Sequence, residues 1–353
     1  TITKTDSIKI LSGSTLAALS FTFSDSFWFN AVEAEVYAMA TCIMALLFWL
    51  GFKWEENIDN ERGNKWLVLI SFIVGLSFGV HFMGLLVIPA IGMIYFFKKH
   101  PSPNFKNFLL ANVLSVAILL FIFKLLLPST LALFGYLEVF FVNSLGLPFD
   151  SGTIFTAILL ITFFIFSLSY TRKKNLYNTN TFLLCVMFIF IGFSLWLMIP
   201  IRSNANTVIN ENSPSDARAL LAYYNLEQYP DTHLFYGPMF SDAYAGQDEN
   251  NPYKDDKPKY ERNDKTQKYF IVNDWESGKI NSNSDHVGLL PRMWSSEHAI
   301  NYMTYFGVLD FSIKPEYLSE TNFKKLVLEF KQSVANGDID AEGYHKFLTQ
   351  YGG

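Results

Sequence analysis

An acidic and aromatic stretch near the N-terminus contains the first residues whose types suit chemistry. Its sequence, SDSFWFNAVEAEVYAM, begins at Ser24 and includes Glu33 and Glu35. Carboxylates at a membrane boundary cost free energy unless water, a partner or a ligand surrounds them. On one helix, residues two apart point about 200° away from each other and cannot face one ligand. Either one carboxylate binds a substrate or a metal while the other is structural, or both are hydrated residues of an interface loop.

A histidine lies in the middle of an apolar stretch that is too long for one membrane crossing. This residue, His81, is flanked by Gly79, Gly84 and Pro89, which together predict a broken helix. Backbone groups freed at a break need partners inside a membrane. His81 could hold a phosphate or relay a proton, or it could only bond to a freed carbonyl, and both alternatives stay open. Glu138 is expected to be a hydrated interfacial residue.

The densest set of polar donors is the sequence IRSNANTVINENSP, directly after the last apolar stretch. An arginine offers a two-pronged fork for phosphate, and asparagines can bridge to sugar hydroxyls. The candidates for substrate binding here are Arg202, Asn204, Asn206, Glu211 and Asn212. The alternative is a hydrogen-bonded turn that joins the membrane region to a soluble domain. Arg292, in LPRMWSS, is ambiguous for the same reasons.

Several other classes of site and partner are not expected. The sequence has no Gly-rich phosphate loop, no His and Cys cluster with metal-ligand spacing and no nucleophile elbow, so we assign no metal ligand and no cofactor, and the metal requirement stays open. The net charge of -5 comes without a long basic run, which argues against nucleic acid. Both cysteines, Cys42 and Cys185, lie in apolar stretches, so a disulfide is not expected.

Composition indicates that membrane helices position these residues. Half of the 353 residues are hydrophobic and only 17% are charged, against about 25% in soluble globular chains. A spanning helix needs about 20 mostly apolar residues. Six stretches approach this, and the third is long enough to form two helices, so we predict seven segments. The stretches are Ile8 to Phe29, Ala34 to Phe52, Trp66 to Phe97, Phe105 to Leu127, Thr153 to Tyr170 and Thr181 to Ile201.

Basic residues predict the orientation of these segments, because Lys and Arg are enriched in cytoplasmic connectors. If seven segments alternate, nearly all basic residues before position 200 fall on one side. The opposite connectors, Asp25 to Glu35 and Pro128 to Gly152, contain no Lys or Arg. Lys124 is the exception, and near a helix end it can reach the interface. The chain from Arg202 onward is therefore expected outside.

The C-terminal part reads as a folded domain, because Trp275, Trp294 and many Tyr and Phe are mixed with its charges. We predict an all-α membrane helix bundle over residues 1-201 and an α+β extracytoplasmic domain over 202-353. In this domain we expect helices at Ala217 to Gln228, with Ser213 as cap, and at Thr321 to Gly337, a strand at Tyr269 to Val272 and a loop at Asp242 to Asp264. Thr1 and Gly353 are expected to be cut ends of a longer protein.

At these same residues the chain resembles a bacterial family of polytopic membrane proteins, long described as a domain of unknown function and related to protein O-mannosyltransferases. The matching blocks, in order, are SDSFWFNAVEAEVYAM, GLSFGVHFMGLLVIPA, IRSNANTVINENSP, EQY followed by LFYGPMF, and LPRMWSS. Five ordered blocks are far more specific than any one of them. The family belongs to the glycosyltransferase C class, whose members take a sugar from a polyprenyl-phosphate carrier on the outer face.

The resemblance implies transfer of a hexose, with mannose the expected sugar, from a polyprenyl-phosphate donor to a protein or glycan acceptor. It also implies a bacterial inner membrane protein whose soluble domain is periplasmic. In that interpretation Glu33 or Glu35 orients donor or acceptor, while Arg202, together with His81, stabilises the departing phosphate.

Two departures from the family pattern limit this interpretation. The family's first outer acidic loop precedes the present residues, so we expect this chain alone not to catalyse. The usual EQYGDRPL reads EQYPDTHL from Glu227, so the roles of the family's Gly, Arg and Pro do not transfer. The rival functions are a membrane transporter, for which a broken helix is also typical, and a non-enzymatic scaffold that displays the soluble domain to partners.

Overall fold

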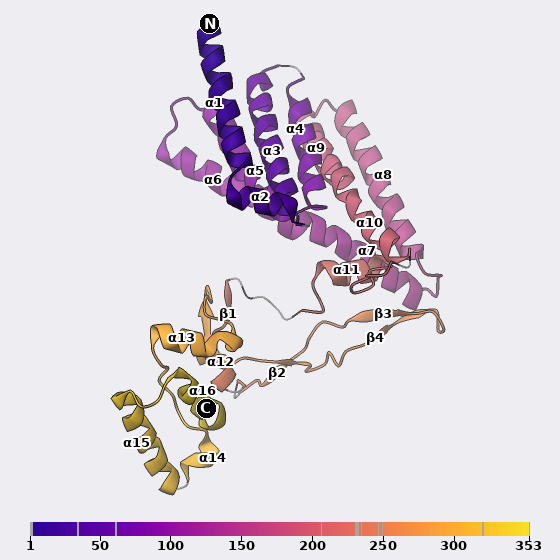
Figure 1. The fold of residues 1–353 in the computed structure, drawn as a ribbon. Coiled ribbons are helices and arrows are strands. Elements are labelled where there is room, and N and C mark those ends of the chain that lie inside the picture. Colours follow the sequence, from indigo (N-terminus) through magenta and orange to yellow (C-terminus); the bar gives the residue numbers. More distant parts are fainter. Residues whose placement is uncertain are drawn as a thin grey trace. The chain divides into compact units, whose positions relative to one another are not determined.

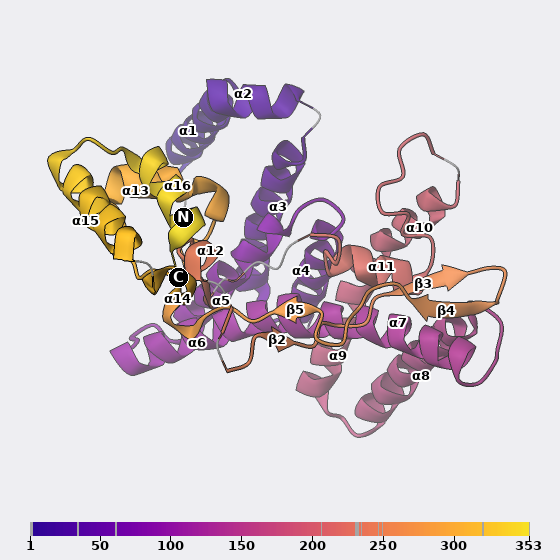
Figure 2. The ribbon, with the colours of Figure 1, turned by 90° about the horizontal axis from the view of Figure 1, so that it is seen from below.

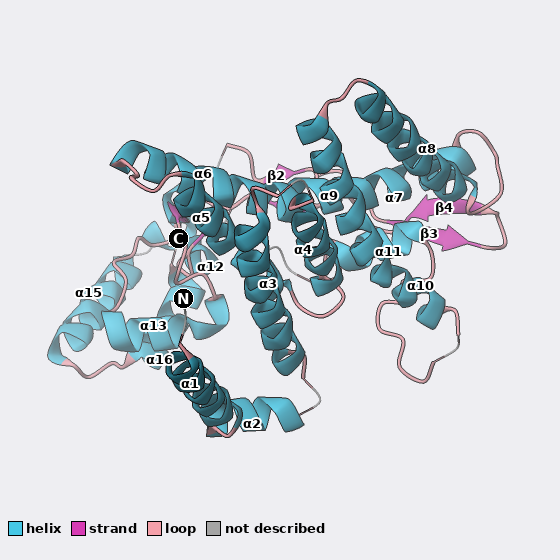
Figure 3. Ribbon diagram, turned by 90° about the horizontal axis from the view of Figure 1, so that it is seen from above, coloured by secondary structure: helices cyan, strands magenta, loops and turns pink. Residues whose placement is uncertain are grey.

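The computed structural model describes residues 3-33, 35-60, 62-205, 207-229, 233, 235-245, 247-248, 250-319 and 321-352. This part of the chain is mostly helical, and its strands are few and short (Figure 3). The chain divides into two compact units. The first contains residues 1-226 and 263-269, and the second contains residues 227-262 and 270-353. Each unit has its own cluster of buried apolar side chains.

The helices of the first unit follow the apolar stretches of the sequence (Figure 1). They are α1 (Lys4–Thr22), α2 (Asp25–Val32), α3 (Tyr37–Asn57), α4 (Asn64–Ser77), α5 (Val87–Lys99), α6 (Phe105–Leu120), α7 (Leu127–Asn143), α8 (Ser151–Lys173), α9 (Tyr177–Phe193), α10 (Met198–Ser203) and α11 (Ala217–Tyr224). Short irregular helices interrupt this series at η1 (Phe82–Leu86), η2 (Phe121–Leu126) and η3 (Ser194–Leu197).

Five helical segments among the described residues are long and apolar enough to cross a membrane, judged by length and composition. These segments are Tyr37–Asn57, Phe82–Lys99, Phe105–Asn143, Ser151–Lys173 and Tyr177–Ser203. Helix α4 is apolar but shorter, and α1 buries none of its residues in the protein. The described helices therefore fit a multi-pass membrane protein, while the number of seven crossings stays a prediction.

Close packing of small residues holds the centre of the helical unit together. Helices α3, α4, α9 and α8 stand side by side in that order (Figures 1 and 3). Where α4 meets α9, a Cβ added to Gly75 would overlap the backbone carbonyl of Ile189, and one added to Gly192 would overlap the carbonyl of Phe72. Glycine is needed at both positions because the two backbones approach each other directly, as is common between membrane helices.

The sixth and seventh helices form one long rod, which the sequence did not predict. We expected a connector from Pro128 to Gly152, but helix continues to Asn143. Proline disrupts a helix because it lacks an N–H and its ring clashes with the preceding turn. Here Pro128 lies in the first turn of α7, directly after the π-helical turn η2. The wider turn changes the hydrogen-bond register where the proline would otherwise end the helix.

Basic residues gather at one end of the helical unit. Lys98 of α5 forms an ion pair with Glu55 of α3 at 2.7 Å, and Lys99 pairs with Asp59. The start of α4 reaches the start of α9 through a hydrogen bond of 3.4 Å from Asn64 to the Thr181 hydroxyl. The connectors α3–α4, α5–α6 and α8–α9 therefore share one end, which we call the basic end, as Figure 1 also shows for α3–α4 and α8–α9.

The short helix α11 packs on α7 at the opposite end (Figure 2). The Leu221 side chain lies against Gly135 so closely that a Cβ there would overlap it. We expected Ser213 to cap this helix, but the cap is Asp216, whose carboxylate accepts hydrogen bonds from the N–H groups of Arg218 and Ala219 at 2.8 and 2.9 Å. Ser213 instead adopts a left-handed backbone, φ 41°, which removes it from the capping position.

The second unit combines short antiparallel strand pairs with a helical C-terminal part. Its strands are β1 (Tyr236–Pro238), β2 (Tyr253–Lys254), β3 (Tyr260–Asn263), β4 (Lys268–Ile271), β5 (Lys279–Ile280) and β6 (Val287–Leu289), and the pairs are β1 with β6, β2 with β5 and β3 with β4. The β3–β4 turn, residues 263-269, clusters with the first unit. Strand β4 confirms the strand predicted at Tyr269 to Val272, one residue shifted.

Helices complete the second unit around an aromatic core. They are α12 (Asp242–Ala245), α13 (Ala299–Phe306), α14 (Pro315–Leu318), α15 (Thr321–Asn336) and α16 (Ala341–Tyr351), with single turns η4 (Ser284–His286) and η5 (Ser296–His298). Phe330 of α15 stacks on Phe347 of α16 with ring centroids 3.7 Å apart. The helix predicted from Thr321 to Gly337 is confirmed, and Gly337 follows it with φ 81°, a conformation that favours glycine.

Candidate functional site

The two candidate glutamates lie at a corner between helices and not on one helical turn. Helix α2 ends at Val32, so Glu33 is its C-cap with an extended backbone, φ -75° and ψ 153°, and Glu35 belongs to the connector before Tyr37. Our premise that they face opposite sides of one helix is therefore wrong. Both side chains are exposed, and neither carboxylate hydrogen bonds or pairs with any residue that the structure describes.

His81 occupies the break between α4 and α5 and is half-buried. Its backbone N–H donates to the Ser77 carbonyl at 2.8 Å, and its Nδ1 accepts from the Met83 N–H at 3.1 Å, which caps η1. The imidazole thus binds a freed N–H, where we had considered a freed carbonyl. Because Nδ1 accepts, a neutral ring carries its proton on Nε2. That leaves one N–H donor for a further partner.

The break at His81 lies next to the acidic corner. The Tyr37 ring, at the start of α3, is 5.6 Å from the His81 ring between centroids. Tyr37 belongs to the acidic and aromatic stretch and lies two residues after Glu35. The contact between these two rings therefore brings the acidic and aromatic stretch together with the apolar stretch that contains His81.

A second helix break, at η3, lies before the Arg202 segment and contacts the region of His81. In η3 the Trp196 Nε1 donates to the Phe78 carbonyl at 2.9 Å, three residues before His81. The same indole packs against the rings of Phe193 and Tyr224, with centroids 5.4 and 5.3 Å away. Sequence reasoning missed Trp196. Its signal was a tryptophan near the end of an apolar stretch, where one ring edge can reach a backbone group.

In the Arg202 segment, the Arg202 side chain is exposed, whereas the Asn204 side chain hydrogen bonds to backbone carbonyls. The Arg202 guanidinium is exposed and makes no hydrogen bond within the described part of the chain. The Asn204 amide donates to the carbonyls of Pro200 and Ser215, each at 2.8 Å, so both of its hydrogens are engaged. Glu211 and Asn212 are exposed, the latter with φ 58°. Asn206 lies outside the described residues.

Glu138 is buried completely, so our prediction of a hydrated residue is wrong. Its exposed fraction is 0%. The carboxylate accepts hydrogen bonds from the Asp150 N–H at 2.6 Å, the Thr153 N–H at 2.8 Å and the Thr153 hydroxyl at 2.9 Å. These donors form the start of α8, where a negative charge is favourable. Glu138 therefore caps a neighbouring helix, a partner 12 to 15 residues away that hydropathy does not reveal.

The second unit has a hollow of about 360 Å³ with both polar and apolar side chains in its lining. Ser241, Tyr244, His286 and Asp310 are among the residues that line it. The Tyr244 hydroxyl lies 2.5 Å from Nδ1 of His345, and burial raises the pKa of Tyr244. Arg292 is exposed in the connector after β6 and does not line this hollow. Within the described residues, no three His, Cys, Asp or Glu side chains are placed to hold a metal ion.

Two protein families match parts of the chain. Residues 1-104 match the Protein O-mannosyl-transferase TMEM260 N-terminal domain. Residues 230-324 match a family of unknown function named DUF8416. Neither a curated protein nor a solved structure matches the chain significantly. The first match indicates a glycosyltransferase-like membrane protein, and its residues include the acidic corner and the break at His81.

Proposed function

We propose that this chain belongs to a membrane glycosyltransferase that transfers a hexose, with mannose the expected sugar, from a polyprenyl-phosphate donor to a protein or glycan hydroxyl. One observation carries the proposal: the similarity to the O-mannosyl-transferase N-terminal domain covers residues 1-104. Within that range lie Glu33, Glu35 and His81, three of the polar residues at the end of the helical unit away from the basic end.

The arrangement of this end suits a lipid-linked donor. Apolar helices keep the polyprenyl tail in the bilayer, while polar groups at the helix breaks meet its phosphosugar near the headgroups. Trp196 ties the break at His81 to the segment that contains Arg202. The open guanidinium of Arg202 and the Nε2 proton of His81 are the donors that we assign to the phosphate.

The reaction itself is a displacement at the anomeric carbon. The acceptor hydroxyl oxygen forms a bond to this carbon as the bond to the phosphate oxygen breaks, and the hydroxyl proton passes to a carboxylate base. The phosphate departs with the bonding electrons and is stabilised by Arg202. Glu33 or Glu35 orients the donor or acceptor, and Asn204, Asn206, Glu211 and Asn212 are proposed as further substrate contacts.

Separate replacement of the two glutamates tests the proposal. The assay uses membranes from cells that express the complete coding sequence and measures transfer of labelled mannose from polyprenyl-phosphate mannose. We expect one of the two variants, Glu33→Gln or Glu35→Gln, to abolish this transfer. The other should leave most activity. Glu56→Gln is the matched control, because Glu56 is exposed at the basic end. Full transfer by both corner variants would exclude the corner from the site, and no transfer by the wild type to any protein or glycan acceptor would exclude the function.

A transporter is the second candidate, favoured by the two interrupted helices at His81 and Trp196. Transporters bind substrate at such breaks near the bilayer midplane. Uptake of a labelled sugar phosphate into vesicles, without covalent transfer, would support this alternative. Transfer without uptake would exclude it.

A further inference from the structure

A large apolar groove lies in the helical unit, toward the basic end and away from the residues proposed for catalysis. Its volume is about 580 Å³, within the range of about 300 to 1,000 Å³ that is usual for small-molecule sites. Helices α4, α5 and α6 form its walls, with contributions from α3, η2 and α9. Most of the lining side chains are aliphatic or aromatic.

Helix α6 lines one side of the groove and contacts α5 closely at one point. A Cβ on Gly92 would overlap the hydroxyl of Ser115, so the two helices touch there. Ser115 is the one buried residue of α6. On the same helix, Leu110 and Leu114 line the groove and remain 66% and 59% exposed. The α6 wall therefore faces both the groove and the surroundings of the helical unit, which are lipid for a membrane-spanning helix.

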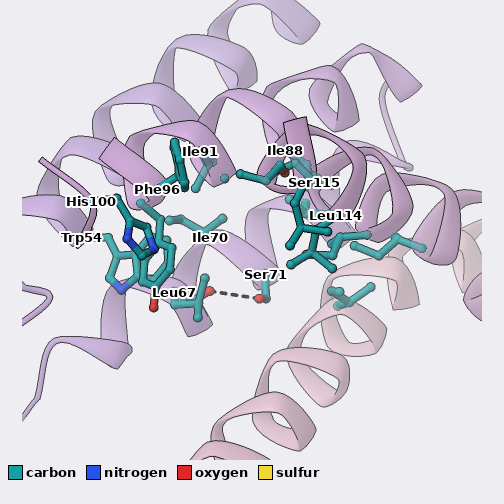
Figure 4. Close-up of a pocket in the computed structure, with 18 of the residues that line it drawn as sticks. Trp54, Leu67, Ile70, Ser71, Ile88, Ile91, Phe96, His100, Leu114 and Ser115 are labelled. Carbon is teal, nitrogen blue, oxygen red and sulfur yellow. Dashed lines mark hydrogen bonds between the residues drawn. The ribbon is translucent and has the colours of Figure 1, made fainter. Parts of the chain in front are cut away.

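One end of the groove is polar. Figure 4 shows Trp54, Phe96 and His100 together at one end, and Leu114 and Ser115 at the other. His100 follows the last residue of α5, and Asn107 lies in the first turn of α6. Both line the groove and both are exposed.

The charges at this end favour an anion. Lys98 and Lys99 are already paired with Glu55 and Asp59. Lys106, next to Asn107, has no ion pair among the described residues. Trp54 is only 8% exposed and lines the groove, yet its Nε1 donates to no described acceptor. A buried N–H without a partner is costly, and an ester or phosphate oxygen would satisfy it.

We propose that this groove binds one acyl chain of an anionic glycerophospholipid, with the lipid phosphate at His100, Lys106 and Asn107. Apolar space that is open to a bilayer fills with the apolar molecules present there, and a phospholipid adds the anion that the polar end requires. The site is separate from the donor site of the proposed function and does not depend on it.

Filling the groove tests the acyl-chain part of the proposal. Ala111 lines the groove, so a tryptophan there should fill it. When phosphatidylglycerol is added to the purified, delipidated chain, Ala111→Trp should lower the bound lipid about tenfold, measured by native mass spectrometry. Val113→Trp is the matched control, because Val113 is 58% exposed on the same helix and does not line the groove. Equal retention by the two variants would overturn the proposal.

Removing the cations tests the headgroup part. The double variant His100→Ala and Lys106→Ala should lower the preference for phosphatidylglycerol over phosphatidylcholine of the same chain length by about fivefold. Lys174→Ala, elsewhere at the basic end, should leave it unchanged. An unchanged preference in the double variant would overturn the assignment. The assignment would also be overturned if glycerophosphoglycerol, which has no acyl chains, bound as tightly as the lipid. Binding of polyprenyl phosphate in place of phosphatidylglycerol would overturn it as well.

Quenching by brominated acyl chains avoids dependence on the folding of Ala111→Trp. Bromine on the chain of phosphatidylglycerol should quench a component of the tryptophan fluorescence of the wild-type chain, and Trp54→Phe should remove that component. The control Trp49→Phe changes a tryptophan that is 52% exposed and does not line the groove. If Trp54→Phe leaves the quenched fraction unchanged, no acyl chain occupies the groove.

Discussion

Two charged residues of the helical unit differ in burial, because the carboxylate of Glu138 is buried and the side chain of Arg202 is exposed. Glu138 has every carboxylate contact inside the protein, where it binds the start of α8. Arg202 has an open guanidinium near the far end of α10. Charges in or near a membrane persist when they are paired or when function requires them. The first residue is thus explained by structure, and the second by the proposed phosphate contact.

Replacement of Glu138 should destabilise the fold. Glu138→Gln keeps the volume but turns an amide group toward N–H donors, so we expect a loss of about 1 to 3 kcal/mol in the free energy of unfolding. Glu138→Ala should cost more, because it leaves three donors without an acceptor. The measurement is unfolding of the purified protein by a denaturing detergent. Glu56→Gln serves as the control, and a Glu138→Gln variant as stable as this control would contradict the capping role.

Replacement of Arg202 should affect donor binding and not stability. Because the guanidinium has no hydrogen bond to the described residues, Arg202→Ala should leave the melting temperature unchanged. If Arg202 binds the carrier phosphate, that variant should lose about 2 to 4 kcal/mol of transition-state stabilisation, as on removal of one oxyanion donor. Arg202→Lys keeps the charge without the two-pronged fork and should retain part of the activity. Lower stability with unchanged donor affinity would remove Arg202 from the site.

At the scale of elements, some helix interruptions could be predicted from the sequence and others could not. The break at His81 was predictable, because Gly79, Gly84 and Pro89 disfavour a continuous helix. The continuation past Pro128 was not, since a proline usually ends a helix and nothing in the local residues announces the π-helical turn that accommodates it. The burial of Glu138 and the bond from Trp196 to Phe78 were also hidden, because each joins segments that hydropathy treats separately.

The contact between α4 and α9 should tolerate no added side chain. Gly75→Ala and Gly192→Ala each place a Cβ against a backbone carbonyl that cannot rotate away, so we expect a loss of about 1 to 3 kcal/mol in stability from overpacking. Gly13→Ala on α1 is the matched control, because nothing lies within 4 Å of its Cβ position, and alanine there should stabilise by about 0.5 to 1 kcal/mol. Equal detergent midpoints for all three variants would contradict the close approach.

At the scale of the whole molecule, the distribution of apolar and basic residues defines a membrane protein with two distinct ends. Many large apolar side chains of the helical unit are exposed, among them Phe105 at 77% and Phe166 at 71%. Exposed apolar surface on this scale needs a non-aqueous surrounding. The basic connectors share one end of the unit, and the corner with Glu33 and Glu35 lies away from it. Sequence alone predicted this polarity, since it depends only on charge and alternation.

We predict that Lys173 is cytoplasmic and that residues 202-353 are outside, because Lys and Arg are enriched in cytoplasmic connectors. Single cysteines test this in a background where Cys42 and Cys185, the free cysteines of the described chain, are replaced by serine. Lys173→Cys lies in the last turn of α8, and Ser296→Cys lies in η5 of the second unit, and both positions are exposed. An impermeant maleimide should label position 296 in intact cells and position 173 only after the membrane is opened. Labelling of 173 but not 296 in intact cells would reverse the orientation. In that case the acidic corner and Arg202 would face the cytoplasm, and a carrier that presents its sugar on the outer face would not reach them.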